Sequence, residues 1–169
     1  LDQLVPKGEN ILKTRGRIEK ANRDFKAKYN TKIQKNFPIV VLINRSSASA
    51  SEIVAGTLQD LDLALILGQG SFGKGLVQSV IAIDNSSALK ITNSKYYIPS
   101  GRGIQKREYI DEDLLSAERT IEDSLFTTKG GRKVRGGGGI TPDILIENNE
   151  QYPLANAIYR DGGFFRFAQ

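Results

Sequence analysis

The chain is organised around residues 37–78, FPIVVLINRSSASASEIVAGTLQDLDLALILGQGSFGKGLVQ. Its apolar run at residues 39–43 is rich in β-branched side chains, which favours a strand that is parallel or fully covered. Ser49, followed three residues later by Glu52, forms a capping-box pattern that predicts the start of a helix. A second strand is expected over residues 63–67. The stretch therefore predicts a strand–helix–strand unit with a right-handed crossover.

The flanking sequence predicts further elements of both kinds. Two hairpins are expected, over residues 76–97 and 126–134, and three helices, over residues 18–29, 111–125 and 152–160. Phe164, Phe165 and Phe167 are expected to enter the core. This alternation predicts one α/β domain over residues 1–169, with added β-hairpins.

Composition limits the chemistry that the chain can perform. Its 169 residues, of which 39% are hydrophobic, suffice for one domain with a core. The absence of cysteine excludes disulfides and thiolate metal ligands, and the absence of histidine means that any nucleophile needs another base. Much of the net charge of +5 comes from residues 13–35, where nine Lys and Arg face Glu19 and Asp24. We expect this segment to be a solvated surface, with contact to phosphates or an acidic membrane as the alternative.

The glycine-rich turn at residues 68–75 has three interpretations. Residues 68–73 fit the G-x-G-x-x-G pattern, and with Lys74 the turn also fits most of a P-loop. The other motifs of a protein kinase are absent, and Gly75 stands where a P-loop needs Ser or Thr. A strand is expected after the turn, so no helix N-terminus is offered to phosphate. In the third interpretation the glycines are structural and Lys74 points at a partner.

A serine is the natural partner for that lysine. A serine hydroxyl needs a base that takes its proton, and a neutral lysine can act as one when burial disfavours its charged form. Lys74 lies between the apolar residues Phe72 and Leu76, whereas the other lysines mostly lie in polar stretches, so Lys74 is the best candidate on sequence environment. Ser49 lies where a helix begins, and the backbone N–H of Ala50 after it would help to hold an oxyanion. The residues alone leave an ordinary N-cap serine and a surface lysine as the alternative.

Five blocks in order make the pattern more specific. They are VVLIN at residues 40–44, SASASEIVAG at 47–56, FGKG at 72–75 with Gln78, KYYIPSGR at 95–102, and GITPD at 139–143. Together they resemble the carboxyl-terminal processing proteases, also called tail-specific proteases, of serine peptidase family S41. The resemblance covers nearly the whole chain.

The resemblance implies a role for each candidate residue. Ser49 corresponds to the nucleophile, Lys74 to the general base, and Gln78 to the residue that orients the lysine, with the N–H of Ala50 in the oxyanion hole. It also implies a serine endopeptidase that cleaves proteins or peptides with an exposed C-terminus, near that terminus, without metal, cofactor or nucleic acid. The location implied is extracytoplasmic, in a bacterial periplasm or envelope, with membrane association left open.

Two features of that family are absent from the sequence: an upstream block of the pattern D-x-R-x-N-P-G-G and a PDZ domain. The chain is therefore expected to be the C-terminal portion of a catalytic core, ClpP/crotonase-like with strand–strand–helix units, and incomplete at its N-terminus. Loss of an oxyanion donor costs roughly 10²–10³ in rate, so little activity is expected from the chain alone. The alternatives are a non-catalytic scaffold or peptide-binding module on the same fold, and a nucleotide-binding protein.

Overall fold

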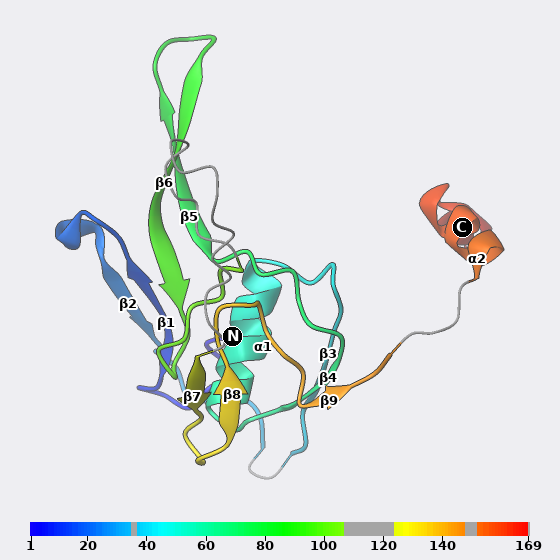
Figure 1. Cartoon of the computed structure of the whole chain (residues 1–169), viewed down its shortest axis with the longest axis horizontal. Helices are drawn as coiled ribbons and strands as arrows, with labels where there is room; N and C mark the ends of the chain where they lie inside the picture. The colour runs from blue at the N-terminus through cyan, green and yellow to red at the C-terminus, as the bar shows by residue number, and fades with distance from the viewer. Residues whose placement is uncertain (35–36, 107–123, 148–151, 169) are drawn as a thin grey trace.

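A computed structural model describes residues 1–34, 37–106, 124–147 and 152–168 (Figure 1). Helix α1 (Ala50–Asp60) lies at the centre, between a four-stranded antiparallel sheet and a three-stranded parallel sheet. Apolar side chains from α1 and from the segments around it form the core: Val5, Ala27, Ile43, Ala55, Leu58, Leu61, Ala64, Ile66, Ile98, Ile104 and Ile140. The predicted α/β class is confirmed.

The parallel sheet has the order β3-β4-β9, formed by Val40–Ile43, Leu65–Gly68 and Ile144–Leu145. Strand β3 pairs in parallel with β4, and α1 connects the two. The predicted strand–helix–strand unit is therefore confirmed, although its second strand begins two residues later than expected.

One face of the parallel sheet is open. Ile43 and Ile66 point toward α1 and are buried, whereas Val40 is 54% and Leu42 is 75% exposed on the opposite face. Successive side chains of a strand alternate between faces, so a sheet with a helix on one side covers only every second residue. The expectation of a parallel or fully covered strand is confirmed by the parallel pairing of β3 with β4, although the described residues leave one face of β3 open.

The antiparallel sheet has the order β2-β1-β6-β5. Its strands are β1 (Asn10–Arg15), β2 (Arg23–Lys26), β5 (Leu76–Ala82) and β6 (Ala88–Tyr97). Strands β5 and β6 form the predicted hairpin, and the Asp84 carboxylate closes its turn by accepting the N–H groups of Ser86 and Ser87, each at 2.8 Å. Only the base of β6 pairs with β1, so the end of the hairpin projects from the body (Figure 1).

The predicted helix over residues 18–29 is wrong. A single 3-10 turn, η1 (Glu19–Ala21), leads into strand β2, which pairs with β1. The Arg23 N–H also donates to Thr14 Oγ1 at 3.2 Å. This segment lacks an apolar face that a helix could bury, whereas pairing with β1 satisfies its backbone groups.

Two short strands follow β6 in the described chain. Strands β7 (Leu125–Thr127) and β8 (Lys133–Arg135) form the predicted short hairpin. Residues 111–123 of the helix predicted over residues 111–125 lie outside the described part, and its last predicted residue, Leu125, begins strand β7. No helix in the described ranges is long and apolar enough to cross a membrane.

The C-terminal helices lie apart from both sheets. Helix α2 (Pro153–Arg160) confirms the predicted helix, and α3 (Gly163–Ala168) follows it (Figure 1). Phe167 is 94% exposed, so its expected place in the core is wrong: α3 does not pack against the core. The side chains of Phe164 and Phe165 lie outside the described part of the structure.

Gly56 allows α1 to pack closely against two distant segments. A Cβ at this position would lie 2.6 Å from the Ile98 side chain and 2.7 Å from that of Ile140. The residues after β6 and the residues before β9 thus approach the helix backbone. Both segments contribute to the site described next.

Candidate functional site

Ser49 stands on a strained turn between β3 and α1. Its backbone angles are φ 56° and ψ −114°, and it is one of two described residues other than glycine with positive φ. Such a conformation costs about 1–3 kcal/mol and clusters at functional sites. A serine on a sharp strand-to-helix turn is also a geometry that exposes a nucleophile. The Ser49 residue is half-buried.

Ala50 is the first residue of α1 and is exposed. The N–H groups of a first helical turn have no carbonyl partner within the helix. The positive end of the helix dipole adds to their preference for negative charge. The Ala50 N–H is therefore available beside the Ser49 hydroxyl.

The buried carboxylate of Glu52 connects the Ser49 turn to the glycine-rich loop. Oε2 accepts the backbone N–H groups of both Ser49 and Lys74, each at 2.8 Å. Oε1 accepts the Gly73 N–H at 2.6 Å and the Ser71 hydroxyl at 2.5 Å. One side chain thus brings the backbones of Ser49 and Lys74 to a single oxygen atom. The capping-box pattern predicts only a cap for Glu52, because nothing local indicates contacts with residues about twenty positions away.

Lys74 and Gln78 are both exposed, and the Gln78 side chain has a hydrogen-bond partner on β6. Lys74 is exposed, so the described residues do not bury its amine. Gln78 is exposed on β5, and its amide donates to Thr92 Oγ1 on β6 at 3.3 Å. A register shift between Val77 and Gln78 interrupts the alternation that would put Lys74 and Gln78 on one face. The orientation of Lys74 by Gln78 remains a prediction.

Two segments hold the loop that carries Lys74. The Lys106 N–H donates to the Gly73 carbonyl at 3.0 Å, and Gln105 Oε1 accepts the Gly75 N–H at 2.8 Å. On the other side, the Ile140 N–H donates to Ser71 Oγ at 2.6 Å. The backbone of the loop is therefore fixed before and after Lys74.

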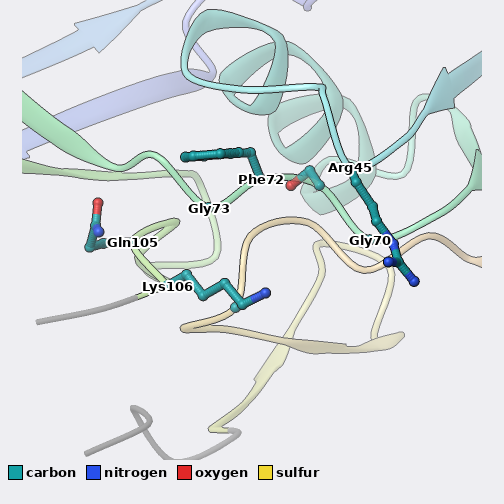
Figure 2. Close-up of a pocket in the computed structure, with 8 residues that line it drawn as sticks. Arg45, Gly70, Phe72, Gly73, Gln105 and Lys106 are labelled. Carbon is teal, nitrogen blue, oxygen red and sulfur yellow. The ribbon is translucent and has the colours of Figure 1, made fainter. Parts of the chain in front are cut away.

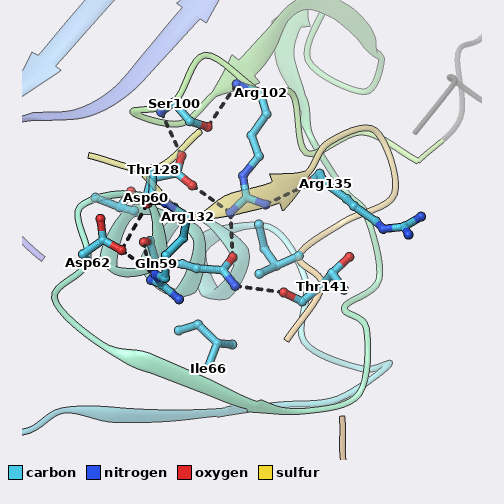
Figure 3. Close-up of polar contacts among 12 residues, drawn as sticks. Gln59, Asp60, Asp62, Ile66, Ser100, Arg102, Thr128, Arg132, Arg135 and Thr141 are labelled. Atoms are coloured by element: carbon cyan, nitrogen blue, oxygen red, sulfur yellow. Dashed lines mark hydrogen bonds and ion pairs between the residues drawn. The ribbon is translucent and has the colours of Figure 1, made fainter. Parts of the chain in front are cut away.

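A buried ion pair anchors one of these segments to the end of α1 (Figure 3). Arg102 is fully buried, with Nη2 2.8 Å from Asp60 Oδ1 and 2.6 Å from Gln59 Oε1. Its Nη1 donates to the Arg135 carbonyl at 2.7 Å, and the Ser100 N–H donates to Asp60 at 2.9 Å. Burial raises the pKa of Asp60, opposed by the charge of Arg102, and burial lowers the pKa of Arg102.

The hydrogen bonds that Glu52 and Gln105 accept from the glycine-rich loop contradict phosphate binding by that loop. A P-loop holds phosphate through free backbone N–H groups and a following helix. Here the Gly73 and Lys74 N–H groups donate to Glu52, and the Gly75 N–H donates to Gln105. Strand β5 follows in place of a helix. Within the described ranges, no group of three or more Asp, Glu, His or Cys side chains is arranged to hold a metal ion.

Comparison with known proteins identifies a matching family and several relatives. The sequence model described as "Peptidase family S41" matches residues 1–116. A carboxy-terminal-processing protease of Bartonella bacilliformis is 41% identical over 146 residues, which cover 86% of this chain and 26% of that protein. A chloroplastic C-terminal processing peptidase of Tetradesmus obliquus is 38% identical over 111 residues, covering 61% of this chain and 24% of that protein. The chain thus spans about a quarter of the length of these curated relatives.

Solved structures are similar over most of the chain. A photosystem II D1 C-terminal processing protease matches with a TM-score of 0.59 and 25% identity, over 94% of this chain and 32% of that one. A putative S41 protease from Bacteroides fragilis matches with a TM-score of 0.51 and 13% identity, over 96% of this chain and 40% of that one, which shows the fold alone.

Proposed function

The chain belongs to peptidase family S41, and from this premise we propose that the whole protein is a serine endopeptidase that cleaves protein substrates near their C-termini. Ser49 is the proposed nucleophile and Lys74 the proposed general base. One observation carries the assignment: a strained serine on a strand-to-helix turn shares its anchoring carboxylate oxygen with the backbone of the lysine.

The proposed reaction follows from this arrangement. Ser49 Oγ attacks the scissile carbonyl carbon, and the neutral amine of Lys74 takes the hydroxyl proton and passes it to the leaving amine. The Ala50 N–H and the positive end of α1 stabilise the oxyanion. Water then gives a proton to the neutral Lys74 amine and attacks the acyl carbon. The ester bond to Ser49 Oγ breaks, Oγ takes that proton back, and the product acid leaves. Gln78 is proposed to orient the Lys74 amine through a hydrogen bond. This requires the Gln78 side chain to rotate away from Thr92.

Lys74 is exposed, whereas the proposed reaction needs its amine to be shielded from water. A lysine amine becomes a base more readily when it is removed from water. We propose that bound substrate and other parts of the whole protein cover Lys74, and that residues 1–169 form a C-terminal portion of a ClpP/crotonase-like catalytic core. We also propose that the substrates have an exposed C-terminus and that the whole protein is extracytoplasmic. Family membership supports both proposals.

The test uses full-length protein and a fluorogenic peptide. Ser49→Ala is expected to lower kcat by about 10⁴-fold or more, since the nucleophile is removed. Lys74→Arg is expected to have a similar effect, because arginine keeps the charge but does not release its proton to act as a base. Ser51→Ala is the matched control, an exposed serine two residues away, and should stay near wild-type activity.

Cleavage that persists in Ser49→Ala at the wild-type rate would refute the dyad. If no variant and no wild-type protein cleaves the peptide, but all of them bind it, the protein is a scaffold or peptide-binding module. The measurement therefore separates the two classes of function.

A further inference from the structure

A broad cavity lies against the two segments that carry the proposed dyad (Figure 2). Arg45, from the turn before Ser49, forms one wall, and Gly70 to Gly73 of the glycine-rich loop form another. The Phe72 N–H donates to the Ser47 carbonyl at 2.9 Å, which joins these walls. The cavity has a volume of about 890 Å³, enough for part of a peptide.

Two cations face this cavity from opposite sides. Figure 2 shows Arg45 beside Gly70 and Lys106 below the loop, with the end of its side chain directed toward the Arg45 side. Both residues are exposed, and neither is among the ion pairs found within the described ranges. The described residues that line the cavity include no carboxylate to balance the two charges. Two like charges on one cavity favour the arrival of an anion.

The open space in the cavity and the hydrogen-bonding groups around it favour a carboxylate over a phosphate. A Cβ added at Gly70 or at Gly138 would meet nothing within 4 Å, so the cavity is open down to the backbone at both glycines. The neighbouring N–H groups of Gly73 and Lys74 already donate to Glu52, which removes the backbone cradle that phosphate prefers. Recognition is then left to the side chains, and a planar guanidinium matches a carboxylate in two parallel hydrogen bonds.

We infer that Arg45 and Lys106 form a subsite that binds a carboxylate of the peptide substrate close to the scissile bond. This inference rests on the proposed peptidase function and adds a substrate preference to it. The carboxylate belongs either to an Asp or Glu side chain or to the C-terminus of the substrate, and both present the same group to the subsite.

Three fluorescent peptides distinguish the sources. The first has a Glu near the cleavage position and an amidated C-terminus, the second has Gln there and an amidated C-terminus, and the third has Gln and a free C-terminus. Binding is measured by anisotropy with full-length protein carrying Ser49→Ala, which needs no turnover. The first or the third peptide is expected to bind about 10- to 100-fold more tightly than the second, as for a charge-assisted hydrogen-bonded pair.

Substitutions then link the preference to the cavity. Arg45→Gln and Lys106→Gln are each expected to remove most of the advantage of the carboxylate peptide without changing the affinity for the neutral one. Lys26→Gln, which removes an exposed cation on β2, is the matched control and should leave the preference intact. A double variant, Arg45→Glu with Lys106→Glu, should reverse the preference toward a peptide with Lys in place of Glu.

Equal affinity for the three peptides, or a preference that survives both Gln variants, would overturn the subsite. Binding of ATP that depends on Arg45, with no preference among the peptides, would overturn it in favour of a nucleotide. Cleavage by wild-type protein is measured in parallel. Efficient cleavage of all three peptides at one rate leaves the proposed function standing and removes the subsite, whereas Arg45-dependent binding without any cleavage removes the catalytic proposal alone.

Discussion

Glu52 accepts four hydrogen bonds that hold the proposed catalytic residues in place. Its side chain is fully buried, and all four donors belong to the Ser49 turn or to the glycine-rich loop. A buried carboxylate is costly unless its oxygens are well hydrogen-bonded, and here each oxygen has two donors. At the residue scale, the proposed dyad therefore depends on a side chain that does not take part in the chemistry.

Glu52→Gln is expected to lower the free energy of unfolding by about 2–3 kcal/mol. The new amide presents an NH₂ group to donors that need an acceptor, so at least one backbone N–H of Ser49, Gly73 or Lys74 is left unpaired. Urea unfolding measures the loss, and amide chemical shifts show which N–H has lost its partner. Glu147→Gln, at an exposed carboxylate, is the control. Unchanged amide shifts at all three of Ser49, Gly73 and Lys74 would contradict the anchoring role of Glu52.

At the scale of elements, the Asp60–Arg102 pair fixes the segment after β6 against the end of α1. That segment continues to Gln105 and Lys106, which hold the glycine-rich loop. A buried ion pair adds little net stability compared with apolar packing, but loss of one partner leaves a charge buried without its counter-ion. The position of the loop before β5 is thus linked to an ion pair at the opposite end of α1.

Arg102→Met is expected to cost about 3–5 kcal/mol at neutral pH, because the Asp60 carboxyl group is left buried without its partner. Burial raises the pKa of Asp60 above 3.8, and loss of Arg102 removes the charge that opposes this rise. The folded state then binds the proton more tightly than the unfolded chain does. The contribution of this group is fully present below pH 3.8 and is lost as the pH rises through the raised folded-state pKa.

Urea unfolding across a pH series measures this effect. The deficit of Arg102→Met relative to wild type should shrink as the pH falls toward 3.8. Adding Asp60→Asn should recover part of the loss at neutral pH and remove the pH dependence of the deficit. A deficit that is constant with pH and unchanged in the double variant would show that the shape of Arg102 matters and its charge does not.

Elements with their own periodic pattern could be predicted from the sequence. Helix α1, strands β3 and β4 and the β5–β6 hairpin have local signals: a cap, an apolar face, or alternation around a turn. Strand β2 has no such signal, because its pairing with β1 is what makes it a strand. The roles of Glu52 and of the Asp60–Arg102 pair depend on contacts between distant segments, which no local pattern encodes.

At the scale of the whole molecule, the described chain exposes an apolar sheet face. Val40, Leu42 and Leu65 lie on the side of the parallel sheet that faces away from α1, and Ile144 of the neighbouring strand β9 is also exposed. Large contiguous apolar patches are uncommon on soluble monomers and often functional, whereas single exposed apolar residues are common. This sheet face groups several exposed apolar side chains, whereas Ile18 is a single exposed apolar residue.

Leu42→Thr is expected to reduce the fluorescence of a bound hydrophobic dye such as ANS, because it breaks the apolar face at its most exposed described residue. Thr keeps the preference for a strand, and Leu42 is 75% exposed, so the free energy of unfolding should change by less than about 0.5 kcal/mol. Ile18→Thr is the matched control: Ile18 is 65% exposed but lies at the start of η1, outside the parallel sheet, and its loss should leave the dye signal nearly unchanged. Equal decreases in both variants would mean that the dye responds to the total exposed apolar area. The sheet face would then not be a distinct dye-binding patch.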